Sequence, residues 1–321
     1  MDTSSFRCSG FKNSGVIRQT TLYHAELARE TPERSGQSLE GGIDSKMSET
    51  LNVGFIGLGQ MASALAGGFI RSKIVAPENV YGYDVSQAAC DKFASTLKAN
   101  VCANPAEVVA NANVLFFAVK PQYMSGALEP VKATIASSPA KLLCVSIAAG
   151  LPIAYFEKAL SPEIRLARVM PNTPCLVGEA ASGFALNANA TSEDGEIVKQ
   201  LLSTVGVAFE LPENQLDAVT GLSGSGPAFV FMAIEALADG GVMAGLPRSV
   251  ALDLAAQTLK GSAEMYLQTK RHPGALKDAV TSPAGTTIAG VAALEERGFR
   301  SALIDAVKRA TNRSRELGSK K

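Results

Sequence analysis

Tryptophan is absent from this chain of 321 residues, which also has only two histidines and five cysteines. The cysteines are odd in number and scattered, without a Cys-x-x-Cys pair among them. Zinc sites need clustered thiolates and imidazoles, and disulfide frameworks need paired cysteines. We therefore expect no metal site and no disulfide scaffold.

An excess of charge of either sign is also missing, because 30 basic residues balance 30 acidic ones. The summed field is therefore too weak to attract nucleic acid or an anionic membrane. No uninterrupted apolar run reaches the roughly 18 to 20 residues of a membrane-spanning helix. Hydrophobic residues nevertheless make up 46% of the chain, which is ample for a buried core. We predict a soluble, cytoplasmic protein with neither a nucleic-acid nor a membrane partner.

The first fifty residues lack periodic apolar positions and are rich in Ser, Thr, Arg and Glu. This composition is typical of a disordered extension, which we predict for residues 1–50. Within the first twenty, Arg7, Lys12 and Arg18 stand against a single acid, Asp2. Because organellar presequences share this bias, import is the alternative hypothesis for the extension.

Two further regions follow, with different periodicities. Over residues 51–211, short apolar runs alternate with helical patterns: NVGFIG, NVYGYD, VLFFAV, LLCVSIA, RLARVM and SGFALN. This alternation predicts an α/β, Rossmann-type domain with a doubly wound, mostly parallel sheet. Residues 212–321 are rich in alanine with helical periodicity, which predicts an all-helical domain. Its wide apolar stripes favour contacts between identical subunits.

A dinucleotide-binding motif opens the first of these domains. Gly57, Gly59 and Ala62 form a G-x-G-x-x-A spacing directly after a strand and at the start of a helix. The first glycine permits the tight turn, the second lets a diphosphate approach the backbone, and the alanine lets the helix pack on the strand. The helix N-terminus then faces the anion. This context favours a nicotinamide dinucleotide over a simple turn.

The ends of later strands complete the predicted cofactor site. Asp84 ends the second strand, where an acid accepts hydrogen bonds from the adenosine ribose. Its charge repels a 2′-phosphate and so favours NADH, although the neighbouring Ser86 is compatible with NADPH. The fourth strand runs into FAVKPQ and the fifth into VSIAAG, both at the edge of the sheet where ligands bind. The predicted cofactor-binding residues in these turns are Ile56, Gly57, Leu58, Gly59, Gln60, Met61, Asp84, Asn104, Ala118, Val119, Lys120, Pro121, Ala148 and Ala149.

Taken together, the motifs resemble those of the pyrroline-5-carboxylate reductases. GFIGLGQM, FAVKPQ, VSIAAG, MPNTP, TGLSGSGPAF, ALADGGV, HPGALKD and TSPAGTT…LEERGFR occur in that family's order and spacing between residues 52 and 317. The resemblance implies NADPH- or NADH-dependent reduction of a five-membered cyclic imine to L-proline. It also implies a homodimer that interlocks through its C-terminal helices and assembles further.

The segment TSPAGTT (281–287) carries the predicted substrate site. A turn that leads into a helix offers unpaired N–H groups to a carboxylate. The resemblance places substrate contacts on Thr286 and Thr287, with the Thr287 hydroxyl at the reacting nitrogen as the catalytic contact. Gly285 and Ser282 lie in the same turn. Glu213 occupies a position that faces the substrate in the family, and Ala279 one that contacts the cofactor, here through its backbone alone.

Two alternatives stay open at this point: a β-hydroxyacid dehydrogenase or other imine reductase, and a dinucleotide-sensing protein without catalysis. The β-hydroxyacid dehydrogenases share the first motif and the spacing of Gly221, Gly224 and Gly226, but their lysine position is occupied here by Val230. A coenzyme-F420-type reductase would explain the first domain and leave TSPAGTT without a role. A non-catalytic dinucleotide-sensing protein would use the cofactor site alone.

Overall fold

The computed structural model describes residues 51–137 and 142–319. Its centre is an eight-stranded sheet in the order β3-β2-β1-β4-β5-β6-β7-β8. β1 to β6 run parallel, β7 is antiparallel to β6, and β8 is parallel to β7. The predicted Rossmann-type, mostly parallel sheet is therefore confirmed. The strands are β1 (Val53–Ile56), β2 (Val80–Tyr83), β3 (Asn100–Val101), β4 (Val114–Phe117), β5 (Leu143–Ser146), β6 (Arg165–Met170), β7 (Ala180–Leu186) and β8 (Gly206–Glu210).

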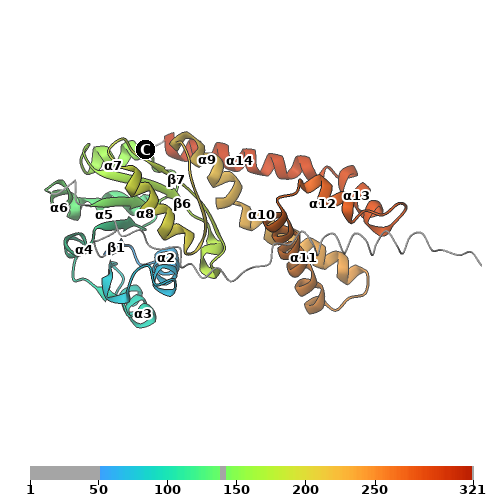
Figure 1. Ribbon diagram of the computed structural model, residues 1–321, viewed down its shortest axis with the longest axis horizontal. Helices are drawn as coiled ribbons and strands as arrows, with labels where there is room; N and C mark the ends of the chain where they lie inside the picture. The colour runs from blue at the N-terminus through green and yellow to red at the C-terminus, as the bar shows by residue number, and fades with distance from the viewer. Residues whose placement is uncertain (1–50, 138–141, 320–321) are drawn as a thin grey trace, which may run out of the picture.

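Helices pack on both faces of this sheet (Figure 1). β1 and β4 are buried along their whole length, as strands covered on both faces must be. Phe55 and Phe116 belong to the core on one face, where their rings stack with centroids 5.0 Å apart, and Phe117 belongs to the core on the other. The covering helices are α2 (Gln60–Arg71), α3 (Gln87–Leu97), α4 (Pro105–Asn111), α5 (Met124–Leu128), α6 (Lys132–Ala136), α7 (Ile153–Ala159) and α8 (Ser192–Ser203).

Two strands, β3 and β8, were not predicted from the apolar runs in the sequence. β3 has only two residues, both exposed, and is therefore too short to show a period. β8 lies at the edge of the sheet, and its Val207 and Phe209 are exposed in the single chain. Residues 1–50, to which the extension and presequence hypotheses refer, lie outside the described residues. The domain boundaries after residues 50 and 211 stay predictions.

The helical domain extends to one side of the sheet (Figure 1). α10 leads away from the sheet. α14 runs back toward the sheet and ends beside α9. Its elements are η5 (Glu213–Gln215), α9 (Leu216–Val219), the π-helical turn η6 (Thr220–Gly224), α10 (Gly226–Met243), α11 (Arg248–Thr269), α12 (Pro273–Ala279), α13 (Thr286–Glu296) and α14 (Phe299–Ser319).

The glycine-rich segment between α9 and α10 forms the π-helical turn. Ser225 N donates to Thr220 O at 2.9 Å, five residues earlier, instead of the four of an α-helix. A Cβ atom on Gly221 would lie 2.2 Å from Thr311 Oγ1, and one on Gly224 would lie 2.5 Å from Met170 Cε. These two glycines therefore let α14 and the end of β6 approach the turn closely.

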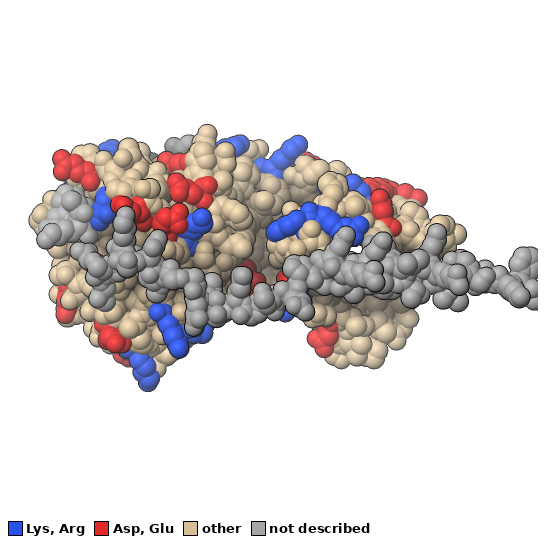
Figure 2. Space-filling model, viewed as in Figure 1, with Lys and Arg blue, Asp and Glu red and all other residues tan. Residues whose placement is uncertain are grey.

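The helical domain buries little apolar surface of its own. Its buried cluster consists of Ala238, Ala251 and Ala255. By length and composition alone, the continuous helical run Glu213–Met243 could cross a membrane, because it contains an 18-residue window with a mean hydropathy of 1.3. On the face that Figure 2 shows, basic and acidic side chains are interspersed. Large apolar side chains exposed on α10, α11, α13 and α14 include Val230, Phe231, Met232, Leu237, Met243, Leu254, Met265, Ile288, Leu294, Phe299, Leu303 and Ile304.

Candidate active site

The turn between β1 and α2 forms an anion cradle. Gly57 has a φ of +94°, and a Cβ atom there would lie 2.7 Å from Val119 Cγ1, so the position requires glycine. At Gly59 an added Cβ atom would meet nothing within 4 Å, which leaves open space above the turn. No side chain caps α2 at Gly59, and the first-turn N–H groups face this space. The cradle can therefore receive a diphosphate.

Asp84 is held against this cradle by two backbone amides. Its Oδ2 accepts from Leu58 N at 2.7 Å and its Oδ1 from Ser86 N at 2.9 Å. Each carboxylate oxygen has a second lone pair, which leaves Asp84 able to accept from ribose hydroxyls. The side chain thus braces the glycine turn, and its role at the ribose stays a prediction.

The turns after β4 and β5 lie beside the cradle. Ala118 N donates to Ile56 O at 2.8 Å, which places Ala118 and Val119 next to the glycine turn. Ala148 is buried and its N–H donates to Ser146 Oγ at 3.3 Å, whereas Ala149 is exposed. The other predicted members are the exposed Gln60 and Lys120, the partly buried Met61 and Pro121, and Asn104. Asn104 caps α4 by accepting from Glu107 N at 3.0 Å.

The TSPAGTT segment forms a turn that leads into the N-terminus of α13. Ala284 adopts a φ of +57°, and a Cβ atom on Gly285 would lie 2.2 Å from Ser282 Oγ. Gly285 is the N-cap of α13 and supplies no side-chain acceptor to the first-turn amides. Among the described residues, no hydrogen bond uses the Thr287 hydroxyl, whereas Thr281 Oγ1 donates to Lys277 O at 2.7 Å. The turn therefore presents unpaired donors to a ligand.

One chain does not bring the cradle and this turn together. α12 and α13 lie at the end of α14 that is farthest from the sheet (Figure 1). The 21 residues of α14 span about 30 Å at 1.5 Å per residue. Ser282, Gly285, Thr286 and Thr287 are consequently remote from the cradle of the same chain, and so is Ala279 on α12.

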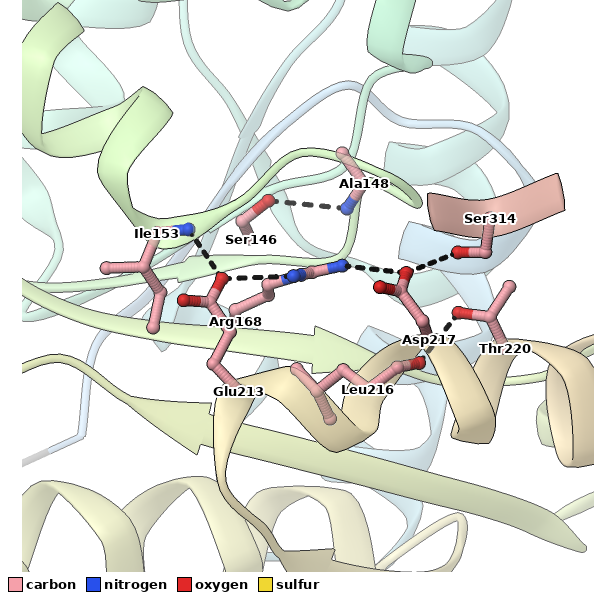
Figure 3. A network of polar contacts seen from close by, with 9 residues as sticks. All are labelled: Ser146, Ala148, Ile153, Arg168, Glu213, Leu216, Asp217, Thr220 and Ser314. Atoms are coloured by element: carbon pink, nitrogen blue, oxygen red, sulfur yellow. Dashed lines mark hydrogen bonds and ion pairs between the residues drawn. The ribbon is translucent and has the colours of Figure 1, made fainter. Parts of the chain in front are cut away.

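Glu213 lies instead at the junction of the two domains (Figure 3). Its Oε1 accepts from Arg168 Nη1 at 3.0 Å and from Ile153 N at 2.7 Å. Asp217 Oδ1 lies 3.9 Å from Arg168 Nη2 and accepts from Ser314 Oγ at 2.6 Å. We call these four side chains, Arg168, Glu213, Asp217 and Ser314, the Arg168 network. A cavity of ≈ 230 Å³ borders it, lined by Gly150, Pro152, Arg168, Asp217, Arg315 and Gly318.

Comparison with known proteins identifies the family. Residues 213–317 match the model of the pyrroline-5-carboxylate reductase dimerisation domain, and residues 52–150 match that of the coenzyme F420-dependent NADP oxidoreductases. The pyrroline-5-carboxylate reductase of Methanosarcina acetivorans is 50% identical over 85% of this chain and 100% of its own length. That of Arabidopsis thaliana is 48% identical over 84% of this chain and 96% of its own length.

This chain belongs to the pyrroline-5-carboxylate reductase family. Solved structures agree with the assignment. The Plasmodium falciparum pyrroline carboxylate reductase with NADP bound is 35% identical, with a TM-score of 0.75 over 84% of this chain and 99% of that one. The reductase of Coxiella burnetii is 32% identical, with a TM-score of 0.79 over the same shares. The chain is accordingly an NAD(P)H-dependent oxidoreductase, and its dimerisation domain makes it a homo-oligomer.

Three thiols of this reductase, those of Cys102, Cys144 and Cys175, are buried. Burial raises the pKa of Cys144 from 9.0 to about 12 and, with the nearby Glu107 carboxylate, that of Cys102 to about 11. Burial likewise raises the pKa of Cys175 to about 11. Since the thiolate is the reactive form, these three thiols should be chemically inert near neutral pH.

We expect iodoacetamide at pH 8 to leave Cys102, Cys144 and Cys175 unmodified in the folded reductase and to modify all three in guanidinium chloride. Peptide mass spectrometry would locate the adducts, and rapid labelling of native protein would contradict the burial.

The same pKa shifts predict that the free energy of unfolding falls above about pH 9. There the unfolded thiols lose protons that the folded ones retain up to about pH 11 to 12.

Sequence reasoning missed the Arg168 network. One signal was available, because Arg168 is a charged residue inside the apolar strand RLARVM, and a buried arginine requires partners. Its partners carried no such signal. Ser314 lies 97 residues from Asp217 in the sequence, so only the fold pairs them.

Proposed function

We propose that the site reduces the C=N bond of L-1-pyrroline-5-carboxylate to give L-proline, with TSPAGTT of one subunit facing the cradle of another. The observation that carries this proposal is the uncapped N-terminus of α13 next to an unbonded Thr287 hydroxyl. A helix N-terminus of this kind binds a carboxylate, and the hydroxyl can contact the nitrogen of the ring. When bound, the dinucleotide supplies the hydride.

The residues of this chain then act mainly by positioning and polarising. The amides of Thr286 and Thr287 hold the substrate carboxylate. Gly285, whose N–H donates to Ser282 O at 3.1 Å, and Ser282 form the turn that borders it. The Thr287 hydroxyl bonds to the reacting nitrogen, so that the adjacent carbon faces the cofactor. The small side chains of Ala148 and Ala149 let a flat nicotinamide lie close to the backbone. No nucleophile is required, because a protonated imine accepts hydride directly.

The distance along α14 is the support for a site shared between subunits. Reacting atoms must approach to about 3 to 3.5 Å, whereas α14 separates the turn from its own sheet by about 30 Å. A second copy related by twofold symmetry can place its turn over the cradle, and its cradle under the first copy's turn.

The exposed apolar surface of the helical domain supports the same dimer. Three buried alanines are too small a core to stabilise the four longer helices α10, α11, α13 and α14 in water. The partner's helices would cover exposed side chains such as Phe231, Met232 and Leu303. Such coverage also accounts for the apolar run Glu213–Met243 without a membrane. Assembly of these dimers into larger oligomers is a further part of the proposal.

For the cofactor we propose a preference for NADH, based on Asp84. The hydrogen bond from Leu58 N fixes the orientation of this carboxylate, which would then accept from the ribose of NADH. No lysine or arginine occurs between residues 85 and 91 to neutralise a 2′-phosphate. A phosphate carries close to two negative charges, so its repulsion by Asp84 would disfavour NADPH.

We expect Asp84→Asn to shift the ratio of kcat/KM values toward NADPH by roughly tenfold, which corresponds to about 1.4 kcal/mol. Asparagine keeps an acceptor for Leu58 N and removes the charge. The control is Asp91→Asn, an exposed acid on α3 that should leave the ratio unchanged. High salt should narrow the wild-type preference by screening. A wild type that favours NADPH, with an indifferent Asn variant, would show that Asp84 does not face the ribose.

A single assay tests the proposed reaction against its rivals. Purified enzyme should oxidise NADH or NADPH when L-pyrroline-5-carboxylate is added, and L-proline should appear in equal amount. Tight cofactor binding without turnover would favour a dinucleotide sensor. Turnover of hydroxyacids alone would favour a dehydrogenase, for which Val230, half-exposed on α10, supplies no base.

A further inference from the structure

Arg168 joins the sheet to the segment with which the helical domain begins. The residue is 8% exposed and is paired in register with Ser146 at the end of β5, just before the Ala148–Ala149 turn. Its guanidinium reaches toward two carboxylates, Glu213 and Asp217 (Figure 3). A guanidinium buried to this degree needs both its charge and its donors matched, which restricts the directions that η5 and α9 can take.

The network also holds the returning end of the helical domain. Ser314, 5% exposed near the C-terminal end of α14, donates to Asp217 Oδ1 at 2.6 Å. The opposite end of α14 contacts α13, which begins at Thr286. One cluster of four side chains therefore fixes both the first and the last helix of the domain relative to the sheet.

A small error at this junction is amplified at the substrate turn. Over the length of α14, a tilt of about 2° displaces the far end by about 1 Å. A misplacement of about 1 Å can lower the rate of a positioned reaction about 100-fold. We propose that Arg168 is a positioning residue for hydride transfer, which sets the angle of the helical domain so that the TSPAGTT turn meets the partner's cofactor. The proposal rests on the shared site of the proposed function.

The test compares two arginines of the same strand, the buried Arg168 and the partly buried Arg165. Arg168→Met removes the link between the domains, whereas Arg165→Met removes an ion pair with Asp194, 2.8 Å away on α8, within the sheet domain. Arg168→Met leaves Glu213 and Asp217 without an arginine, and Arg165→Met does the same to Asp194, so both should lower the melting temperature. Only Arg168→Met changes the junction, and this makes Arg165→Met the matched control for instability.

We expect Arg168→Met to lower kcat about 10- to 100-fold in assays with L-pyrroline-5-carboxylate. The Kd for NADH, measured by fluorescence, should stay within about twofold, because Arg168 does not belong to the cradle. The primary deuterium isotope effect on kcat with 4-deuterated NADH should rise as hydride transfer becomes slower. Arg165→Met should keep the wild-type kcat and isotope effect. Arg168→Lys should lie in between, since an ammonium cannot bridge both carboxylates as a guanidinium does.

Ser314→Ala keeps the test valid even if Arg168→Met does not fold. It removes only the bond between Asp217 and α14 and should reduce kcat several-fold with a raised isotope effect. Wild-type kcat in both Ser314→Ala and the Arg168 variants would overturn the positioning role, and so would a loss of NADH affinity that parallels the loss of kcat. A wild-type enzyme without imine reduction would instead count against the proposed function, which the same assay reports separately.

Discussion

Replacing Gly59 by alanine is expected to weaken dinucleotide binding about 10- to 150-fold without weakening the fold. Gly59 has a φ of −68°, which alanine adopts freely, and an added Cβ atom meets nothing within 4 Å. In the complex, that Cβ atom would hold the diphosphate away from the amides of α2. Losing one hydrogen bond to a charged group removes about 1.5 to 3 kcal/mol of binding free energy. Titration calorimetry with NADH and thermal unfolding of the free protein would measure the two effects.

Two glycines provide the controls for Gly59→Ala. Gly126→Ala, in the surface helix α5 with open space around it, should change neither property. Gly57→Ala should lower both stability and affinity, because its φ of +94° and the 2.7 Å approach to Val119 Cγ1 exclude a side chain. Unaltered NADH affinity in Gly59→Ala would mean that the diphosphate lies elsewhere.

Replacing Thr287 by valine is expected to lower kcat/KM for the imine about 5- to 150-fold, as the loss of one hydrogen bond of about 1 to 3 kcal/mol predicts. Valine nearly preserves the shape of threonine and removes the hydroxyl that the described residues leave unbonded. Cofactor affinity should hardly change. Thr258→Val is the control, since that exposed hydroxyl bonds only to Leu254 O of its own helix. Wild-type kinetics in Thr287→Val would show that the Thr287 hydroxyl does not contact the substrate and that the residue only begins α13.

These two variants also test the shared site when they are mixed. In a mixed dimer, one site combines the Gly59→Ala cradle with the Thr287→Val turn, and the other site is intact. Random exchange of subunits in a twofold dimer should therefore restore about a quarter of the wild-type activity. Subunits dissociated in mild denaturant and refolded together would provide the sample. If each chain formed its own complete site, exchange would restore nothing.

Local chemistry carried the predictions that succeeded. The spacing of Gly57, Gly59 and Ala62 depends on contacts within one turn, and the apolar runs of β1 and β4 record their burial on both faces. Such features depend on residues that are close together in the sequence, so the sheet and the cradle could be predicted from it. The role of Asp84 as a ribose acceptor stays a prediction, although its contact with the glycine turn places it where the motif requires.

Features that depend on distant residues were not derivable in this way. TSPAGTT reads as a helix N-terminus, but nothing within it tells that α14 carries it about 30 Å from its own cradle. Glu213 was expected to contact the substrate, and the structure shows its Oε1 bonded to Arg168 and Ile153. The pairing of Asp217 with Ser314 arises only once α14 has folded back. The roles of Glu213, Ser282 and Thr287 toward the substrate are therefore still proposals.

The π-helical turn at Thr220–Gly224 sets the rotational phase of the helix that follows it. Each residue of an α-helix turns the chain by about 100°. Removing one residue from this turn would therefore convert it to an α-helical one and rotate α10 by about that angle. Phe231 and Met232 would keep their chemistry yet face a different direction, away from the surface that the partner would cover in the proposed dimer. The number of residues between α9 and α10 is thus as decisive for dimer formation as the apolar side chains themselves.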